Sequence, residues 1–218
     1  MARINRIIFL HILIVSIFLT ACQREVDEGT ENFDYIPTSP GSSWRYTSSR
    51  KGRFDLDATS KDTIINGYKY RVFNKLNYSN GLTTKVYYGK TNKTYRTFGT
   101  TGISLQPGEI VLLKDTVVTG LWSSGVPLSG GFIDYHKFTI TGRDLQYTVN
   151  NITYNNVIRL DYEWLLYDPN AGQQVHYGDG KFYYARGVGL IESICDGQWG
   201  LPPNREQDTV RLYSFNIK

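Results

Sequence analysis

The segment 157–167, VIRLDYEWLLY, alternates apolar and polar side chains, and this alternation constrains the fold more than any other feature of the sequence. The apolar set consists of Ile158, Leu160, Tyr162, Trp164 and Leu166, and the polar set of Arg159, Asp161 and Glu163. Because neighbouring side chains of a strand point to opposite faces, the pattern predicts a strand with one packed face and one wet face. Such strands are typical of antiparallel sheets. Residues 68–72 show the same alternation, with Tyr68, Tyr70 and Val72 on the apolar side.

The rest of the chain favours strands joined by tight turns. It contains five alanines and one methionine against 17 tyrosines, a composition that suits pleated sheets better than helices. Asn66-Gly67 and Asn150-Asn151 each separate two strand-like segments and tolerate the positive φ of a type I′ turn. Further turns are expected at Asn80-Gly81, at Asp179-Gly180 and at residues 187–189. The sequence therefore predicts an all-β fold: an antiparallel meander, a sandwich or an open barrel with tight hairpins.

The first 22 residues have the layout of an export signal. Arg3 and Arg6 precede an apolar run over residues 7–19, which is short of the roughly 20 residues that a transmembrane helix needs. The sequence Leu19-Thr20-Ala21-Cys22 then resembles the lipobox of bacterial lipoproteins, in which the cysteine becomes the lipid-modified first residue. Fatty acids such as palmitate on Cys22 would anchor the protein in a membrane. The alternative is an ordinary cleaved signal or an uncleaved anchor, with a coincidental cysteine.

These features divide the chain into three parts: a lipoprotein signal peptide (1–21), a lipidated flexible tether (22–34) and a single all-β domain (35–218). The tether is acidic and has few large apolar side chains, so it cannot bury enough surface to fold. Removing residues 1–21 takes away two of the 24 basic residues and none of the 20 acidic ones, which leaves a net charge of +2. No basic run remains, so nucleic acid is not an expected partner. We expect the cell envelope, with the outer membrane favoured and its periplasmic or surface face left open.

Two longer motifs carry a family resemblance. The stretch 35–46, YIPTSPGSSWRY, and the stretch 183–192, YYARGVGLIE, look like the opening and closing motifs of a family of secreted lipoproteins from Gram-negative bacteria, of unknown function. The resemblance implies an all-β, lipid-anchored envelope protein and brings no activity. The motifs predict that Trp44 plugs the core and that Gly187 and Gly189 allow a bend that points Leu190 inward. Because Cys22 is expected to be acylated, Cys195 has no partner in the chain and is expected to be a buried structural thiol.

Few residues indicate chemistry. Asp134 and His136 share a mainly apolar strand face, where an acid and an imidazole could form a general-base pair of a hydrolase. A hydrogen-bonded structural pair is the favoured interpretation, because no nucleophile lies beside them in the sequence. His176 is expected at a hairpin rim. The segment 168–179 begins like a calcium loop, but glycine occupies the fifth position where an oxygen ligand is needed, so a plain turn is predicted. We expect no metal and no cofactor.

Three Asp-Thr-apolar strings, centred on Thr63, Thr116 and Thr209, resemble acceptors for bacterial O-glycosylation. The simpler interpretation is that each marks the passage from a turn into a strand.

Aromatic residues make up 14% of the chain and give the remaining clue to function. Trp164 lies on the apolar face of its segment and is expected in the core. Trp122 and Trp199 lie among glycines and are expected to be exposed, where they could stack on a ligand. The expected function is non-catalytic binding of a glycan, a lipid or an envelope protein by a membrane-anchored domain. The alternatives are a hydrolase that uses Asp134 and His136, and a lipid or lipoprotein carrier with a hydrophobic cavity.

Overall fold

A computed structural model describes residues 34–100, 107–198 and 205–218 of the protein. Cys22 and Trp199 lie outside these residues. Twelve strands make up the fold: β1 (Ser43–Ser48), β2 (Gly52–Ile65), β3 (Tyr68–Asn77), β4 (Thr83–Thr91), β5 (Thr94–Thr100), β6 (Pro107–Lys114), β7 (Leu121–Pro127), β8 (Ile133–Val149), β9 (Ile152–Asp168), β10 (Gln173–Ala185), β11 (Gly189–Gln198) and β12 (Arg205–Asn216). A short 3-10 helix, η1 (Ser129–Gly131), precedes β8. In the described part of the chain, no helix has the length and apolar character needed to cross a membrane.

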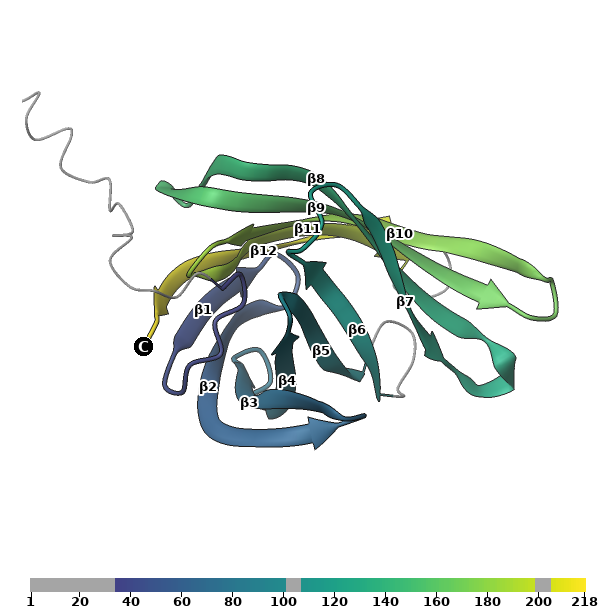
Figure 1. Ribbon diagram of the computed structural model, residues 1–218, viewed down its shortest axis with the longest axis horizontal. Helices are drawn as coiled ribbons and strands as arrows, with labels where there is room; N and C mark the ends of the chain where they lie inside the picture. The colour runs from purple at the N-terminus through teal and green to yellow at the C-terminus, as the bar shows by residue number, and fades with distance from the viewer. Residues whose placement is uncertain (1–33, 101–106, 199–204) are drawn as a thin grey trace, which may run out of the picture.

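The twelve strands form one antiparallel sheet in the order β6-β5-β4-β3-β2-β1-β12-β11-β10-β9-β8-β7. Each strand pairs with the next one in the sequence, except that β6 and β7 do not pair and form the two edges of the sheet. In addition, β1 pairs with β12. The sheet curls round so that these edges come together (Figure 1). The all-β meander predicted from the sequence is thus confirmed, in the form of a nearly closed, barrel-shaped sheet. All twelve strands and both apolar cores lie within residues 34–218, and a chain that begins at Gln23 retains all of them.

The seam between β6 and β7 is closed by side chains. The Val111 N–H donates to Ser124 Oγ at 2.9 Å, and the indole Nε1–H of Trp122 donates to the Val111 carbonyl oxygen at 2.8 Å. Gly108 lies so close to the Val126 side chain that a Cβ atom on it would clash. The two edges therefore meet without backbone hydrogen bonds between them. Side chains instead form hydrogen bonds to backbone groups that a paired strand would otherwise engage.

The predicted hairpin turns at residues 66–67 and 150–151 are confirmed. Asn66 has a φ of 50°, and Asn150 and Asn151 have φ values of 50° and 64°, as a type I′ turn requires. The turn predicted at Asp179-Gly180 is wrong, because both residues lie inside β10. There Gly180 permits a close approach instead, since a Cβ atom on it would come within 2.8 Å of Cys195 Sγ.

The β8–β9 hairpin extends beyond β10 and its tip lies over β11 and β12 (Figure 1). At the tip, Asn150 Nδ2 donates to the Leu212 carbonyl oxygen at 3.0 Å. The Tyr147 ring stacks on Tyr183 with centroids 4.0 Å apart, and its hydroxyl donates to Glu192. The hairpin thus supplies a second layer over part of the sheet.

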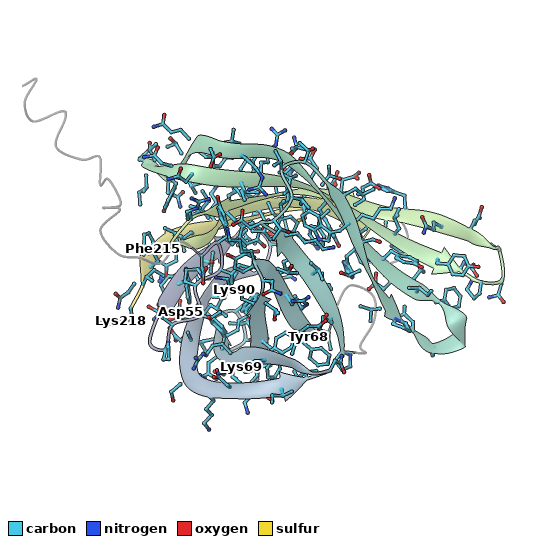
Figure 2. The ribbon with its side chains drawn as sticks, in the orientation of Figure 1. Asp55, Tyr68, Lys69, Lys90, Phe215 and Lys218 are labelled. Carbon is cyan, nitrogen blue, oxygen red and sulfur yellow. The ribbon has the colours of Figure 1, made fainter. Side chains whose placement is uncertain are left out.

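Side chains fill most of the interior (Figure 2). The buried side chains belong to two apolar cores. The first includes Trp44, Leu56, Phe73, Ile191 and Leu212, and the second includes Tyr35, Leu113, Phe138, Ile158 and Leu160.

Candidate functional site

The two motifs that carry the family resemblance meet in the structure. The indole Nε1–H of Trp44 donates to the Val188 carbonyl oxygen at 2.6 Å, and the Gly187 N–H donates to the Asp34 carbonyl oxygen at 2.9 Å. Gly189 has a φ of 109°, and a Cβ atom on it would lie 3.4 Å from Trp44 Nε1. The predicted core position of Trp44 is confirmed, since only 3% of the residue is exposed.

The segment before β1 crosses the interior and closes one end of it. The Tyr35 N–H donates to the hydroxyl of Tyr95 on β5, whereas Asp34 contacts the turn between β10 and β11. In the strand order, β5 is separated from β10 and β11 by β4, β3, β2, β1 and β12. Tyr35 and Ile36, which lie between these two contacts, are both buried. Lys90 also holds Asp34 by an ion pair. This end of the barrel-shaped sheet is therefore plugged.

Next to the plug, the interior contains a cavity of about 240 Å³. The lining consists mostly of apolar and aromatic side chains from the plug and from β1, β2, β3, β4, β10, β11 and β12: Ile36, Pro37, Trp44, Tyr46, Phe54, Leu56, Phe73, Lys75, Val86, Tyr88, Tyr184, Gly189, Leu190, Ser193 and Val210. Leu190 is among them, so the prediction that the bend at Gly187 and Gly189 turns it inward is confirmed.

Three tyrosines of the lining supply hydroxyl groups without charge. Burial raises the pKa of Tyr46 and of Tyr184, and it raises the pKa of Tyr88 to about 12. The Tyr46 hydroxyl donates to the Leu190 carbonyl oxygen at 3.0 Å. Within the described part of the chain, no hydrogen bond engages the hydroxyls of Tyr88 and Tyr184, which leaves both available to a ligand.

Lys75 is the one charged residue among the described residues of the lining. Its Nζ lies 4.3 Å from the centroid of the Phe54 ring. Burial lowers the pKa of Lys75, and the nearby charge of Lys51 lowers it further. The cavity is thus an apolar chamber with a single ammonium group.

The sequence did not indicate Lys75, which lies at an odd-numbered position of β3. The alternation of residues 68–72 marks the even-numbered positions as apolar, yet Phe73 and Lys75 line the cavity. The register between β3 and β4 is unbroken from Tyr70 to Leu76, so the odd-numbered side chains of β3 share one face. The short apolar pattern therefore identified the strand but not the face that lines the cavity.

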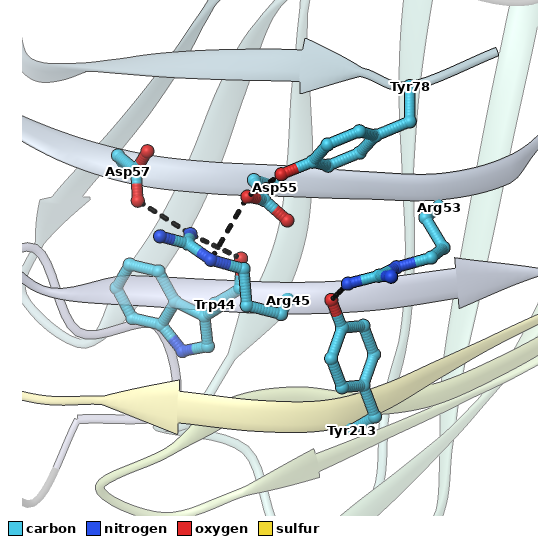
Figure 3. Close-up of polar contacts among 7 residues, drawn as sticks. All are labelled: Trp44, Arg45, Arg53, Asp55, Asp57, Tyr78 and Tyr213. Carbon is cyan, nitrogen blue, oxygen red and sulfur yellow. Dashed lines mark hydrogen bonds and ion pairs between the residues drawn. The ribbon is translucent and has the colours of Figure 1, made fainter.

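The outward face of the cavity wall carries ion pairs that join β1 to β2 (Figure 3). Arg45 Nε lies 3.1 Å from Asp55 Oδ2, and Arg45 Nη1 lies 2.6 Å from Asp57 Oδ1. The Tyr78 hydroxyl donates to Asp55 Oδ2 at 2.8 Å. Arg45 is directly opposite Asp55 in the β1–β2 register, between the inward-facing neighbours Trp44 and Tyr46. These ion pairs link β1 to β2 on the side of the wall that faces away from the cavity.

Asp134 and His136 lie inside the sheet but do not line the cavity. Asp134 Oδ1 accepts a hydrogen bond from Trp164 Nε1, and His136 Nδ1 lies 2.8 Å from the Tyr162 hydroxyl. His136 Nε2 lies 3.5 Å from Asp134 Oδ2, and the two side chains are 5% and 1% exposed. The structure places the two side chains next to each other in a buried network with Tyr162 and Trp164.

The expected exposure of Trp122 is wrong. The residue is 6% exposed, and its ring stacks on Phe138 with centroids 5.9 Å apart. The glycines near Trp122 do not mark an exposed loop: Gly125 allows a close approach to Ile133 and Tyr135 of β8, and Gly108 allows β6 to approach Val126 of β7. Trp199 lies outside the described residues.

The remaining candidate residues from the sequence do not line the cavity. Thr116 is exposed, and Thr63 and Thr209 are half-buried within β2 and β12. His176 Nε2 lies 2.9 Å from Asp179 Oδ1 near the rim. Cys195 is a free, half-buried thiol, and burial raises its pKa to about 12.

The predicted plain turn after Asp168 is confirmed, since its carboxylate accepts the Asn170 N–H at 2.8 Å. Among the described residues, no group of three His, Cys, Asp or Glu side chains could hold a metal ion.

Comparison with known proteins gives one structural likeness. No protein-family model matches the sequence, and no curated protein matches it either. A crystal structure of a protein from Parabacteroides distasonis, described as a "putative lipoprotein", superposes with a TM-score of 0.51 at 11% sequence identity. The superposition covers 86% of this chain and 100% of the other. At this identity the likeness supports the fold.

Proposed function

We propose that the protein is a lipid-anchored component of the cell envelope whose β domain binds a small apolar or amphiphilic molecule inside the barrel-shaped sheet. The observation that carries this proposal is the cavity of about 240 Å³ between Trp44, Phe73 and Tyr184. It is preformed, concave and mostly apolar, with a few polar groups, which is the usual character of a small-molecule site.

The lining suits binding better than catalysis. It offers tyrosine hydroxyls, Ser193 and the ammonium of Lys75, whereas the acid and imidazole of Asp134 and His136 lie outside it. An apolar ligand would gain about 25 cal/mol for each Å² of its surface removed from water. This chemistry favours the carrier-type alternative with a hydrophobic cavity over stacking on exposed tryptophans.

Two observations support lipid anchoring: the lipobox-like sequence that ends at Cys22, and the description of the Parabacteroides distasonis protein of similar fold as a lipoprotein. Asp34 is held at the plugged end of the sheet, which is where the chain arrives from Cys22. We propose the outer membrane as the location: the acidic residues after Cys22, which also suit a solvated tether, resemble the charged export signal of some Gram-negative lipoproteins.

A calorimetric titration tests the binding proposal. The chain from Gln23 to Lys218 retains every described residue and would be titrated with 1-decanol in detergent-free buffer. We expect saturable binding with a stoichiometry near one, and loss of binding in Val86→Phe, which fills the cavity from β4. The matched control is Val118→Phe, since Val118 is 77% exposed. If wild type does not bind, or if Val86→Phe binds equally while remaining folded by thermal melting, the proposal is wrong.

A further inference from the structure

The ammonium group of Lys75 has no anionic partner in the part of the chain that the structure describes. Within those residues, no carboxylate forms an ion pair with it, and the Phe54 ring at 4.3 Å is its closest compensating group. A cation taken out of water is costly unless it is paired, and a cation–π contact offsets only part of that cost.

The two nearest charges do not neutralise Lys75. Lys51 repels it, and Asp208 attracts it only weakly. The Asp208 carboxylate is already engaged by the hydroxyls of Ser48 and Ser49, at 2.8 Å and 3.1 Å. The positive charge on the cavity wall therefore stays uncompensated while the cavity is empty.

The ammonium also lies at the end of the cavity away from the plug. Its Nζ lies over the ring of Phe54, which is opposite Tyr46 in the β1–β2 register, whereas Pro37 of the plug lies beside Gly189 and Trp44. A ligand that places an apolar chain against Ile36 and Leu190 would carry its other end toward Lys75.

We propose that Lys75 binds the head group of the ligand, and that the ligand is a monocarboxylate with a linear apolar chain, of the fatty-acid class. This inference rests on the proposed function, because it assigns the chemistry of the same cavity. A single ammonium matches a single negative charge. A phosphate dianion is typically held by several donors or by the fork of an arginine, and the described lining contains no arginine.

The test compares ligands that share a chain and differ in head group. Decanoate, 1-decanol, decylamine and decyl phosphate would each be titrated calorimetrically into the chain from Gln23 to Lys218 at neutral pH. We expect decanoate to bind at least about tenfold more tightly than 1-decanol, since a hydrogen bond between two charged groups is stronger than one to a neutral hydroxyl. Decylamine is expected to bind most weakly.

Three variants assign the preference to Lys75. Lys75→Met keeps the length and removes the charge, so decanoate should fall to the affinity of 1-decanol. Lys75→Arg should retain the preference. Lys85→Met is the matched control, because Lys85 is exposed on the neighbouring strand β4, and it should behave like wild type.

The outcomes separate this inference from the proposed function. If decanoate and 1-decanol bind equally well, or if Lys75→Met keeps the preference, the head-group assignment is overturned and the apolar site stands. If decyl phosphate binds more tightly than decanoate, the carboxylate class is overturned. If none of the four compounds binds, the proposed function itself fails.

Discussion

The indole Nε1–H of Trp44 donates a 2.6 Å hydrogen bond to the carbonyl oxygen of Val188, joining residues that are 144 positions apart. Trp44 belongs to the motif at the start of the domain, and Val188 to the motif at the turn between β10 and β11. The bond explains why the two motifs belong together: they form one wall of the cavity and hold the plugged end of the sheet.

Trp44→Phe removes this bond and leaves the buried Val188 carbonyl without a partner. We expect a loss of about 1–3 kcal/mol in the free energy of unfolding, in addition to any loss of packing. Urea unfolding measures it. Tyr213→Phe is the control, because it removes a hydrogen bond between Arg53 and a tyrosine hydroxyl on the outer surface and should change stability by less than about 0.5 kcal/mol. Equal stability of Trp44→Phe and wild type would contradict the role assigned to the bond.

The two asparagine turns offer a matched comparison. Asn66 and Asn150 both begin two-residue turns with a φ of 50°, but only Asn150 also donates to the Leu212 carbonyl oxygen. Asn→Ala imposes the same backbone strain at both sites. We therefore expect Asn150→Ala to cost about 0.5–1.5 kcal/mol more than Asn66→Ala in urea unfolding. Equal losses would mean that the hairpin tip is not held on β12 by this bond.

The seam between β6 and β7 depends on the lack of a side chain at Gly108. Gly108→Ala introduces a Cβ atom against Val126 and should cost about 1–3 kcal/mol through overpacking. Val126→Ala removes the obstructing methyl groups, so the double variant should lose less stability than the sum of the two single variants. Thermal or urea unfolding of the four proteins measures the coupling. Additive losses would show that the two strands do not approach each other in this way.

Decanoate binding should depend on pH through Lys75. Burial, and then Lys51, lowers the pKa of Lys75 below 10.5, so its charge is complete at pH values below that lowered pKa and is lost as the pH rises through it. Since a carboxylate is ionised above about pH 5, calorimetry should show tight binding from there up to the pKa of Lys75 and weaker binding beyond it. Affinity for 1-decanol should not follow this profile.

The lowered pKa of Lys75 also predicts how its charge affects the stability of the empty domain. Below its lowered pKa, Lys75 carries the cost of a buried charge in the empty domain, and that cost disappears by pH 10.5. Lys75→Met should therefore be at least as stable as wild type at neutral pH. A pH profile of decanoate binding that persists in this variant would contradict the assignment to Lys75.

Cys22→Ser tests the anchor. Cells that express the wild-type chain with a clickable palmitate analogue should incorporate the label into the protein, and Cys22→Ser should abolish it. Cys195→Ser is the matched control and should keep the label, because Cys195 lies within the sheet with its pKa raised to about 12. Labelling that persists in Cys22→Ser would overturn lipidation at this residue.

Much of the local structure could be predicted from the sequence. Alternation over residues 157–167 identified a strand with one buried face, and Asn66-Gly67 and Asn150-Asn151 identified two hairpin turns. These features depend on neighbouring residues alone, since alternation and positive φ are properties of a few consecutive positions.

The candidate site could not be predicted in the same way. Lys75 lines the cavity although residues 68–72 indicated the other face of β3 as apolar, and Trp122 is buried where β6 and β7 close together over Gly108. The sequence by itself determined that strands and turns form, and it indicated a signal segment ahead of them. Only the tertiary structure decided which faces point inward, where the sheet closes and what the interior holds. The inward face and the closure arise from contacts between distant strands, which no local pattern records.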